Sequence, residues 1–426
     1  MSQKVSGVKG MSDLLPSSAG GDVEVWQFLE QRSREVLRRY GYGEVRTPVL
    51  EETALFVRGV GEGTDIVGKE MYTFTDKGGR SLSLRPEATA GLVRAYIEHS
   101  VQNQEPLTRW FCFGPMFRYE RMKTGRYRQF WQLDVEAFGA KGAPQDAEVI
   151  DLALEILRAA GLTGVRLELN SIGDSECRPA YQKKLVAYFE GHRAQLCADC
   201  QVRLDRNPLR ILDCKVETCR QIARGAPALL DNLCDPCRQH FAEVQRLLTL
   251  VDAPFTINPW IVRGLDYYVR TAFELIADDP VLGTASAVGG GGRYDGLVQS
   301  LGGPDVPGVG FALGVDRLRL LLQASGQKFA PEPDLFVAAV DEKSFDAAFG
   351  LAARLRRDGL WVELDTRGGS LKSQMKRADK TGARYALVVG EREVAEQAGE
   401  LKPMRGGGEP RRVSFAALPV ILREAR

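Results

Sequence analysis

Residues 107–139 read LTRWFCFGPMFRYERMKTGRYRQFWQLDVEAFG, and this stretch decides the fold. Two runs with strand character flank a charged loop, residues 121–128, and the turn falls at Lys123-Thr-Gly125. Because a strand has a two-residue period, its side chains point alternately to opposite faces. On the second run, one face carries Gln132, Asp134 and Glu136, and the other carries Trp131, Leu133, Val135 and Ala137. The stretch therefore predicts a long hairpin with one packed face and one polar face.

Arginines flank the loop of this hairpin. A guanidinium group donates two parallel hydrogen bonds to a phosphate, so this arrangement suits a nucleotide. From charge alone, a basic hairpin exposed to solvent is the simpler interpretation. The polar face that ends in Gln132 and Glu136, opposite a wholly apolar face, favours a lined cavity instead.

Upstream of the hairpin, residues 23–40 have the spacing of an amphipathic helix that ends at Gly41. Residues 44–50 follow as a predicted strand. Pro48 removes one ladder donor from it, which is tolerated at a sheet edge or where two chains meet, so it indicates a subunit interface here. Further on, Pro86 suits the first position of a helix, which would put Glu87 and Thr89 at the helix start.

Three shorter motifs lie downstream: RGLDYYVRTAFE at 263–274, GGGGRYDGL at 289–297 and GVGFALGVDRLRLLL at 308–322. The first is equally compatible with an aromatic-rich core strand. The third is a glycine-spaced strand that leads into a helix with Arg317 in its first turn, and glycines let a ligand approach the backbone. Taken singly, each motif is weak.

Residues 172–254 are predicted to be helical and are rich in cysteine, which indicates an inserted subdomain. Two Cys-x-x-Cys pairs can supply the four thiolates of one structural zinc site. These are Cys197, Cys200, Cys234 and Cys237. The alternative is a set of reduced, partly buried thiols. Cys112 and Cys177 are expected to be packing residues.

Beyond a turn-rich linker at 323–333, strand and helix patterns alternate over 335–389, which indicates a small α/β domain. We therefore expect a first domain at 1–325, interrupted by the insertion at 172–254, and a second domain at 331–426. Composition is globular, with 44% hydrophobic residues and a net charge of +1. No window approaches the apolar run of a membrane helix, and the N-terminus lacks an export signal, so a cytoplasmic location is expected.

Together, the hairpin motif and the downstream motifs resemble, in set and order, the three signatures of class II aminoacyl-tRNA synthetases. RGLDYY and GGGGRYDGL resemble the histidine-specific signatures of the histidyl-tRNA synthetase family. The likeness runs from KGMSDLLP, residues 9–16, to SLKSQMKRADKTGARYALVVG, residues 370–390. It implies an α+β catalytic domain with a mainly antiparallel sheet, the helical insertion and a C-terminal α/β domain that binds the anticodon. The implied reaction ligates L-histidine to tRNA(His) through a histidyl-adenylate, with ATP and Mg²⁺.

The resemblance also implies roles for single residues. Arg263 and Arg118 would be catalytic, at the α-phosphate. The ATP-binding residues would be Arg118, Glu120, Arg126, Phe130 and Arg317. The histidine-binding residues would be Glu87, Thr89 and Gln132 at the α-amino group, and Glu136, Tyr268 and Tyr294 around the imidazole. In the anticodon domain, Lys372, Lys376 and Lys380 share one helical face that would contact tRNA phosphates, although such a face is more often merely solvated.

Two residues depart from the family pattern: Tyr119 stands where histidine is frequent, and Asp316 where glutamate is common. A rival interpretation is a synthetase-like regulatory subunit of ATP phosphoribosyltransferase, which would bind histidine without charging tRNA. It predicts loss of the arginines that flank the hairpin loop, of Arg263 or of the C-terminal domain. Another class II specificity would require a different sequence in place of RGLDYY.

Overall fold

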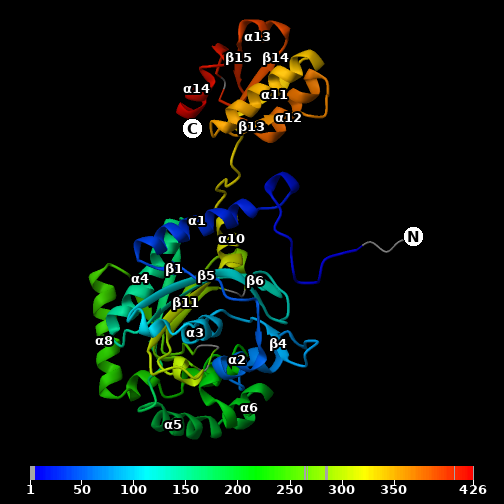
Figure 1. The fold of residues 1–426 in the computed structure, drawn as a ribbon. Helices are drawn as coiled ribbons and strands as arrows, with labels where there is room; N and C mark the ends of the chain where they lie inside the picture. Colours follow the sequence, from blue (N-terminus) through cyan, green and yellow to red (C-terminus); the bar gives the residue numbers. More distant parts are fainter. Residues whose placement is uncertain (1–4, 263–264, 266, 284–285, 407, 426) are drawn as a thin grey trace. The chain divides into compact units, whose positions relative to one another are not determined.

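The computed structural model describes residues 5–262, 265, 267–283, 286–406 and 408–425. The chain divides into two compact units, which mainly comprise Val25–Lys328 and Phe329–Arg426 (Figure 1). Among the described residues, no helix has the length and apolar character needed to cross a membrane.

The first unit is built on one eight-stranded sheet. The strands, in spatial order, are β1 (Gly43–Glu44), β5 (Thr108–Phe117), β6 (Gln129–Phe138), β11 (Gly308–Gly314), β10 (Ala287–Arg293), β9 (Val269–Ala277), β7 (Val165–Ser171) and β8 (Phe255–Ile257). Neighbouring strands are antiparallel except at the two edges, where β1 pairs with β5 and β7 with β8 in parallel. The predicted mainly antiparallel sheet is confirmed.

The first unit also contains helices outside residues 172–254. They are α1 (Val23–Arg39), α2 (Thr53–Val60), α3 (Thr89–Glu98), α4 (Ala143–Ala159), α9 (Leu297–Ser300) and α10 (Val315–Ala324). Helix α4 packs against β11, and α10 packs against β6. A small sheet of β2 (Leu50–Glu52), β4 (Ser81–Leu84) and β3 (Thr73–Thr75) precedes α3.

Two local predictions upstream of the hairpin are wrong. Residues 44–50 do not form one strand, because the pairing stops after β1 and resumes at β2, and Pro48 lies in the gap. Pro86 is not the first helical residue either, since α3 begins at Thr89. The Glu87 side chain accepts the N–H groups of Thr89 and Ala90, so Glu87 and Thr89 lie at the helix start, as expected.

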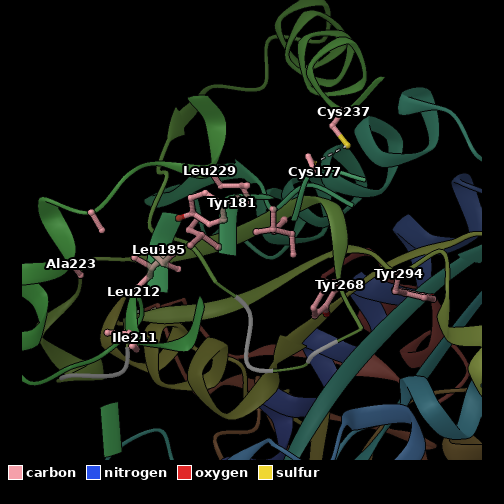
Figure 2. Packing of buried hydrophobic residues seen from close by; sticks show 14 of the residues in the cluster. Cys177, Tyr181, Leu185, Ile211, Leu212, Ala223, Leu229, Cys237, Tyr268 and Tyr294 are labelled. Carbon is pink, nitrogen blue, oxygen red and sulfur yellow. Dashed lines mark hydrogen bonds between the residues drawn. The ribbon is translucent and has the colours of Figure 1, made fainter. Parts of the chain in front are cut away.

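Residues 172–254 are helical, as expected, with no strand among them. The helices are α5 (Arg178–Glu190), α6 (Ala198–Arg206), α7 (Glu217–Arg224) and α8 (Asp235–Leu250). Tyr181, Leu185 and Ile211 are among the side chains that form the core of this insertion (Figure 2). The same apolar cluster includes Tyr268 and Tyr294, so the insertion packs directly on the segments that carry these two tyrosines.

The second unit contains a five-stranded sheet in the order β13 (Val362–Leu364), β12 (Leu335–Ala339), β14 (Tyr385–Val389), β15 (Ala398–Pro403) and β16 (Arg411–Ser414). Strands β13, β12 and β14 are parallel to one another. Strand β15 is antiparallel to β14, and β16 is antiparallel to β15. Its helices are α11 (Glu342–Arg357), α12 (Leu371–Thr381), α13 (Glu391–Glu396) and α14 (Leu418–Glu424). Asp341 caps α11 by accepting the Ser344 N–H at 2.8 Å. The expected small α/β domain is confirmed.

Candidate active site

A cavity of about 320 Å³ opens on the central strands of the catalytic sheet. Most of the residues expected to bind ATP or histidine line it. They are Glu87, Thr89, Arg118, Glu120, Arg126, Phe130, Gln132, Glu136, Tyr268 and Arg317. Tyr294 does not line the cavity, but its hydroxyl donates to Glu136 from behind. Arg263 lies outside the described residues.

Glu136 lies deep in the cavity wall and is fully buried on β6. One carboxylate oxygen accepts the Thr89 hydroxyl at 2.6 Å, and the other accepts the Tyr294 hydroxyl. Burial raises the pKa of Glu136 to about 8, because the charged form loses its hydration. Without a ligand, this carboxyl group therefore holds a proton through much of the neutral range.

Glycines on β11 make room for this arrangement. Gly310 pairs with Glu136 across the sheet, and a Cβ atom at Gly310 would lie 1.8 Å from the Glu136 Oε2 atom. A Cβ atom at Gly308 would lie 2.2 Å from the Tyr294 ring. The glycine spacing of the third motif is thus a packing requirement of the Glu136 and Tyr294 side chains.

Two further carboxyl groups are buried beside Glu136. Glu87 accepts the backbone N–H groups of Thr89 and Ala90, both at 2.9 Å, at the start of α3. Burial raises the pKa of Glu87. Asp134 is also fully buried, and burial together with the nearby Glu87 raises its pKa to about 8. Three carboxyl groups at one end of a cavity make that end suited to a cationic ligand.

Several buried polar atoms at the carboxyl end of the cavity lack a hydrogen-bond partner among the described residues. Within the described part of the chain, the buried Oε1 atom of Gln132, the Oδ2 atom of Asp134 and the Tyr267 hydroxyl have no hydrogen-bond partner. A buried polar atom left unpaired costs about 1–3 kcal/mol. Asp134 lies on the predicted polar face between Gln132 and Glu136, and Tyr267 precedes Tyr268, but no sequence pattern predicted a role for either residue.

The opposite end of the cavity carries guanidinium groups. Arg126 donates to Glu120 at 2.9 Å, and Arg317 donates to the backbone oxygen of Gly125 at 3.0 Å and to that of Ala287. Burial, followed by the neighbouring Arg126, lowers the pKa of Arg317. These cations lie where an anionic ligand would relieve their mutual repulsion.

Arg118 lies between the two ends. Its guanidinium carbon is 5.1 Å from the centre of the Phe130 ring, and its Nε atom donates to the backbone oxygen of Pro86 at 2.9 Å. A cation and an aromatic ring thus lie side by side, and these two group types suit the phosphate and the base of a nucleotide, respectively. Lys215, from the insertion, also lines the cavity and was missed, because nothing in its local sequence marks it.

Two further buried acids connect elements around the site, and Asp316 also lines the cavity. Asp316 accepts the Trp131 N–H at 2.7 Å, so it ties the start of α10 to β6, and burial raises its pKa to about 6. Asp146 on α4 is fully buried, and it accepts from Arg293 on β10 and from His240 on α8 at 2.8 Å. Asp146 therefore joins the last helix of the insertion to the catalytic sheet.

The four cysteines predicted to share one zinc ion do not come together. Cys197 and Cys200 group with Cys214 and Cys219, whereas Cys234 and Cys237 group with Asp174 and Cys177. That prediction was wrong, because the Cys-x-x-Cys spacing brings two sulfurs together locally but does not specify which pairs meet. Cys177, expected only to pack, belongs to the second group.

In the second unit, Lys372, Lys376 and Lys380 are exposed on α12 at intervals of four residues. Residues at this spacing lie on one side of a helix.

Comparisons with known proteins identify the family of this chain. A family model described as "Histidyl-tRNA synthetase" matches residues 10–318, and one described as "Anticodon binding domain" matches residues 334–425. A histidine–tRNA ligase of Trichlorobacter lovleyi is 50% identical over 405 residues, 95% of each chain. One of Anaeromyxobacter dehalogenans is 52% identical over 404 residues, 94% of this chain and 95% of the relative.

Among solved structures, the crystal structure of apo S. aureus histidyl-tRNA synthetase matches with a TM-score of 0.82. It is 37% identical and covers 99% of this chain and 100% of the S. aureus chain. The family model alone matches more than half of the chain, and the relatives match nearly all of it. The resemblance inferred from the motifs is confirmed, and the chain belongs to the histidyl-tRNA synthetase family.

Proposed function

We propose that this chain ligates L-histidine to tRNA(His) in two steps. In the first, a histidine carboxylate oxygen attacks the α-phosphorus of ATP, and the bond to the leaving pyrophosphate breaks. In the second, a ribose hydroxyl at the tRNA end attacks the adenylate carbonyl, and AMP leaves. The separation of charge within the cavity carries this proposal: buried carboxyl groups at one end suit the cationic groups of histidine, and guanidinium groups at the other suit phosphates.

At the nucleotide end, Arg118 and Arg263 would hold the α-phosphate and stabilise charge that develops during the attack. Phe130 would stack on the adenine and Glu120 would contact it, while Arg126 and Arg317 bind the outer phosphates. The contacts of Arg118 to Pro86 and of Arg317 to Gly125 support these roles, because they hold both guanidinium groups in place before ATP binds.

At the amino-acid end, Glu87, Thr89 and Gln132 would bind the α-amino group, and the unpaired Gln132 Oε1 atom is a ready acceptor. Glu136, Tyr268 and Tyr294 would surround the imidazole. A carboxylate that accepts one ring N–H, next to phenol groups, would disfavour amino acids of similar size that lack those nitrogens.

Magnesium would bind together with the ATP phosphates, because Mg²⁺ prefers oxygen ligands and usually shares them with a bound nucleotide. The carboxylate of Glu274 lines the cavity and would offer such an oxygen. When bound, the ion would neutralise charge on the pyrophosphate.

We further propose that the Lys372, Lys376 and Lys380 face contacts tRNA phosphates, supported by the match of residues 334–425 to an anticodon-binding family. A homodimer through α1 and the segment around Pro48 stays a prediction, as does the cytoplasmic location. The regulatory alternative has less support, since Arg118 and Arg126 line the cavity and the C-terminal domain is present.

The direct test is ATP–pyrophosphate exchange measured with each of the twenty amino acids. Exchange that depends on histidine alone is the expected result. Exchange with a different amino acid would reject the specificity, and histidine binding without any exchange would support the regulatory alternative instead.

A further inference from the structure

The insertion repeats one local arrangement twice. The sequences LCADC at 196–200 and LCDPC at 233–237 each begin with a buried leucine, Leu196 or Leu233. In each, the first cysteine is the residue before a helix and has extended backbone angles, and the second lies in the first helical turn of α6 or α8. This conformation directs both sulfurs of a pair toward the same point beside the helix start.

Each pair meets a second pair of ligand-type groups from another segment. Cys214 and Cys219 complete the first group, and Asp174 and Cys177 complete the second, with all four ligand atoms of a group within 4.8 Å of one another. The first group contains four cysteines, and the second contains three cysteines and one carboxylate.

The sulfur spacing fits a metal ion and not a disulfide bond. The sulfurs of Cys197 and Cys214 are 3.9 Å apart, as are those of Cys177 and Cys237, which point toward one another in Figure 2. Four thiolates at about 2.3 Å from a tetrahedral zinc ion have sulfurs about 3.8 Å apart. A disulfide would require a separation of about 2.05 Å.

Asp174 is oriented as a ligand by a neighbouring cation. Its Oδ2 atom accepts from Arg270 at 3.3 Å, which leaves its Oδ1 atom facing the sulfurs of Cys177 at 3.7 Å and Cys234 at 3.8 Å. A carboxylate held in this way by an outer partner is typical of metal sites. Gly173 also matters here, since its φ is +61° and a Cβ atom would lie 2.6 Å from the Cys177 sulfur.

From these two groups we propose that the insertion binds two zinc ions. One would be held by Cys197, Cys200, Cys214 and Cys219, and the other by Asp174, Cys177, Cys234 and Cys237. Zinc is the ion that fits, because it takes four tetrahedral ligands and forms strong bonds with thiolates, with histidine or a carboxylate in the remaining position.

The two ions would stabilise different connections. The first closes the loop between α6 and α7 and lies next to Lys215, which lines the catalytic cavity. The second joins the start of α8 to the segment after β7 and, through Arg270, to β9. Helices α6 and α7 have only nine and eight residues, lengths at which an isolated helix is unstable in water.

The experiment measures zinc in the full chain, produced in zinc-supplemented cells without a metal-binding tag and purified without chelator. Elemental analysis should find two zinc ions per chain. Cys219→Ser and Cys237→Ser should each lower the content to one. Cys112→Ala removes a buried cysteine that belongs to neither group, so it should retain two.

Zinc content near zero in the wild-type chain would overturn the two-site proposal. A wild-type content of one ion that is absent from both Cys219→Ser and Cys237→Ser would overturn it as well. If a variant does not fold, the wild-type chain still decides the question. Titration of its thiols with an organomercurial should release two zinc ions to an indicator dye, and release of none would reject both sites. Fewer than eight free thiols after denaturation without reductant would show disulfides in their place. Histidine-dependent exchange is scored separately, so the two proposals fail independently.

Discussion

In the catalytic sheet, Gln132, Asp134 and Glu136 come from one strand, whereas each cysteine group of the insertion draws its members from separate segments. The strand sets the spacing of its polar residues through its own hydrogen bonds to β5 and β11. The insertion contains no strand, so its polar groups meet where loops and helix starts converge. Backbone pairing stabilises the first arrangement, and we attribute the second to metal ions.

The largest effect expected is on the catalytic side of this comparison. Arg118→Ala should slow histidine-dependent pyrophosphate exchange by about 10²–10³-fold, because one preorganised donor at the α-phosphate is worth that much. The matched control is Arg121→Ala, which removes an exposed arginine of the same loop that does not line the cavity. The sequence predicts a loss of the same size for Arg263→Ala. A normal rate in Arg118→Ala would reject its catalytic role.

Removal of zinc should destabilise the insertion and leave the catalytic sheet intact. Hydrogen exchange followed by mass spectrometry should show faster exchange at residues 174–177, 197–219 and 233–238 after chelation. The amides of β5 and β6 should keep their protection, because their hydrogen bonds do not depend on the ions. Equal loss in the hairpin and the insertion would show that the sheet also depends on metal. Unchanged exchange in the insertion would mean that the ions do not stabilise it.

The lysine face of α12 should affect charging and leave activation intact. Replacement of Lys372, Lys376 and Lys380 by alanine should weaken tRNA binding and make its salt dependence shallower, by about 0.7–0.9 in the log–log slope per lost phosphate contact. Pyrophosphate exchange should be unchanged. Replacement of Lys343, Arg392 and Lys402, which are exposed elsewhere in the same domain, is the control for net charge. Identical charging by both triple variants would show that the α12 face is only solvated.

The smallest expected effect is the release of a proton when histidine binds. Burial raises the pKa of Glu136 to about 8, so the free protein holds a proton there at pH 7. The bound imidazole N–H favours the carboxylate, so binding should release roughly one proton and affinity should rise as the pH approaches about 8. Calorimetry in buffers of different ionisation enthalpy measures this release. Proton uptake on binding would contradict the assigned role of Glu136.

Much of the catalytic site was predictable from the sequence because most of its residues fall within a few short motifs. The alternation on residues 131–137 predicted the polar face of β6, and the three motifs selected most of the cavity lining. Asp134 was visible on the same face, but alternation cannot show that Oδ2 would have no partner among the described residues. Pro48 was misplaced because a proline is compatible with both an edge strand and a gap between strands.

The insertion was less predictable because its contacts connect residues far apart in the sequence. The Asp146 cluster joins α4, α8 and β10 across about a hundred residues and more, and no local pattern predicts it. The Cys-x-x-Cys pairs were recognised as metal-type ligands. The sequence does not show which other segment of the insertion supplies the remaining two ligands of each group. Only the fold shows that Asp174 takes the place of a fourth thiolate in one group.

The central claim is that one cavity holds histidine at its carboxyl end and the ATP phosphates at its arginine end. A crystal structure of the full chain with a non-hydrolysable histidyl-adenylate analogue tests this most directly. We predict the imidazole within hydrogen-bond distance of Glu136 and a phenol hydroxyl, the α-amino group at Gln132, and the phosphate mimic at Arg118. An analogue bound with its imidazole beside Arg126 and Arg317, or bound outside this cavity, would contradict the account.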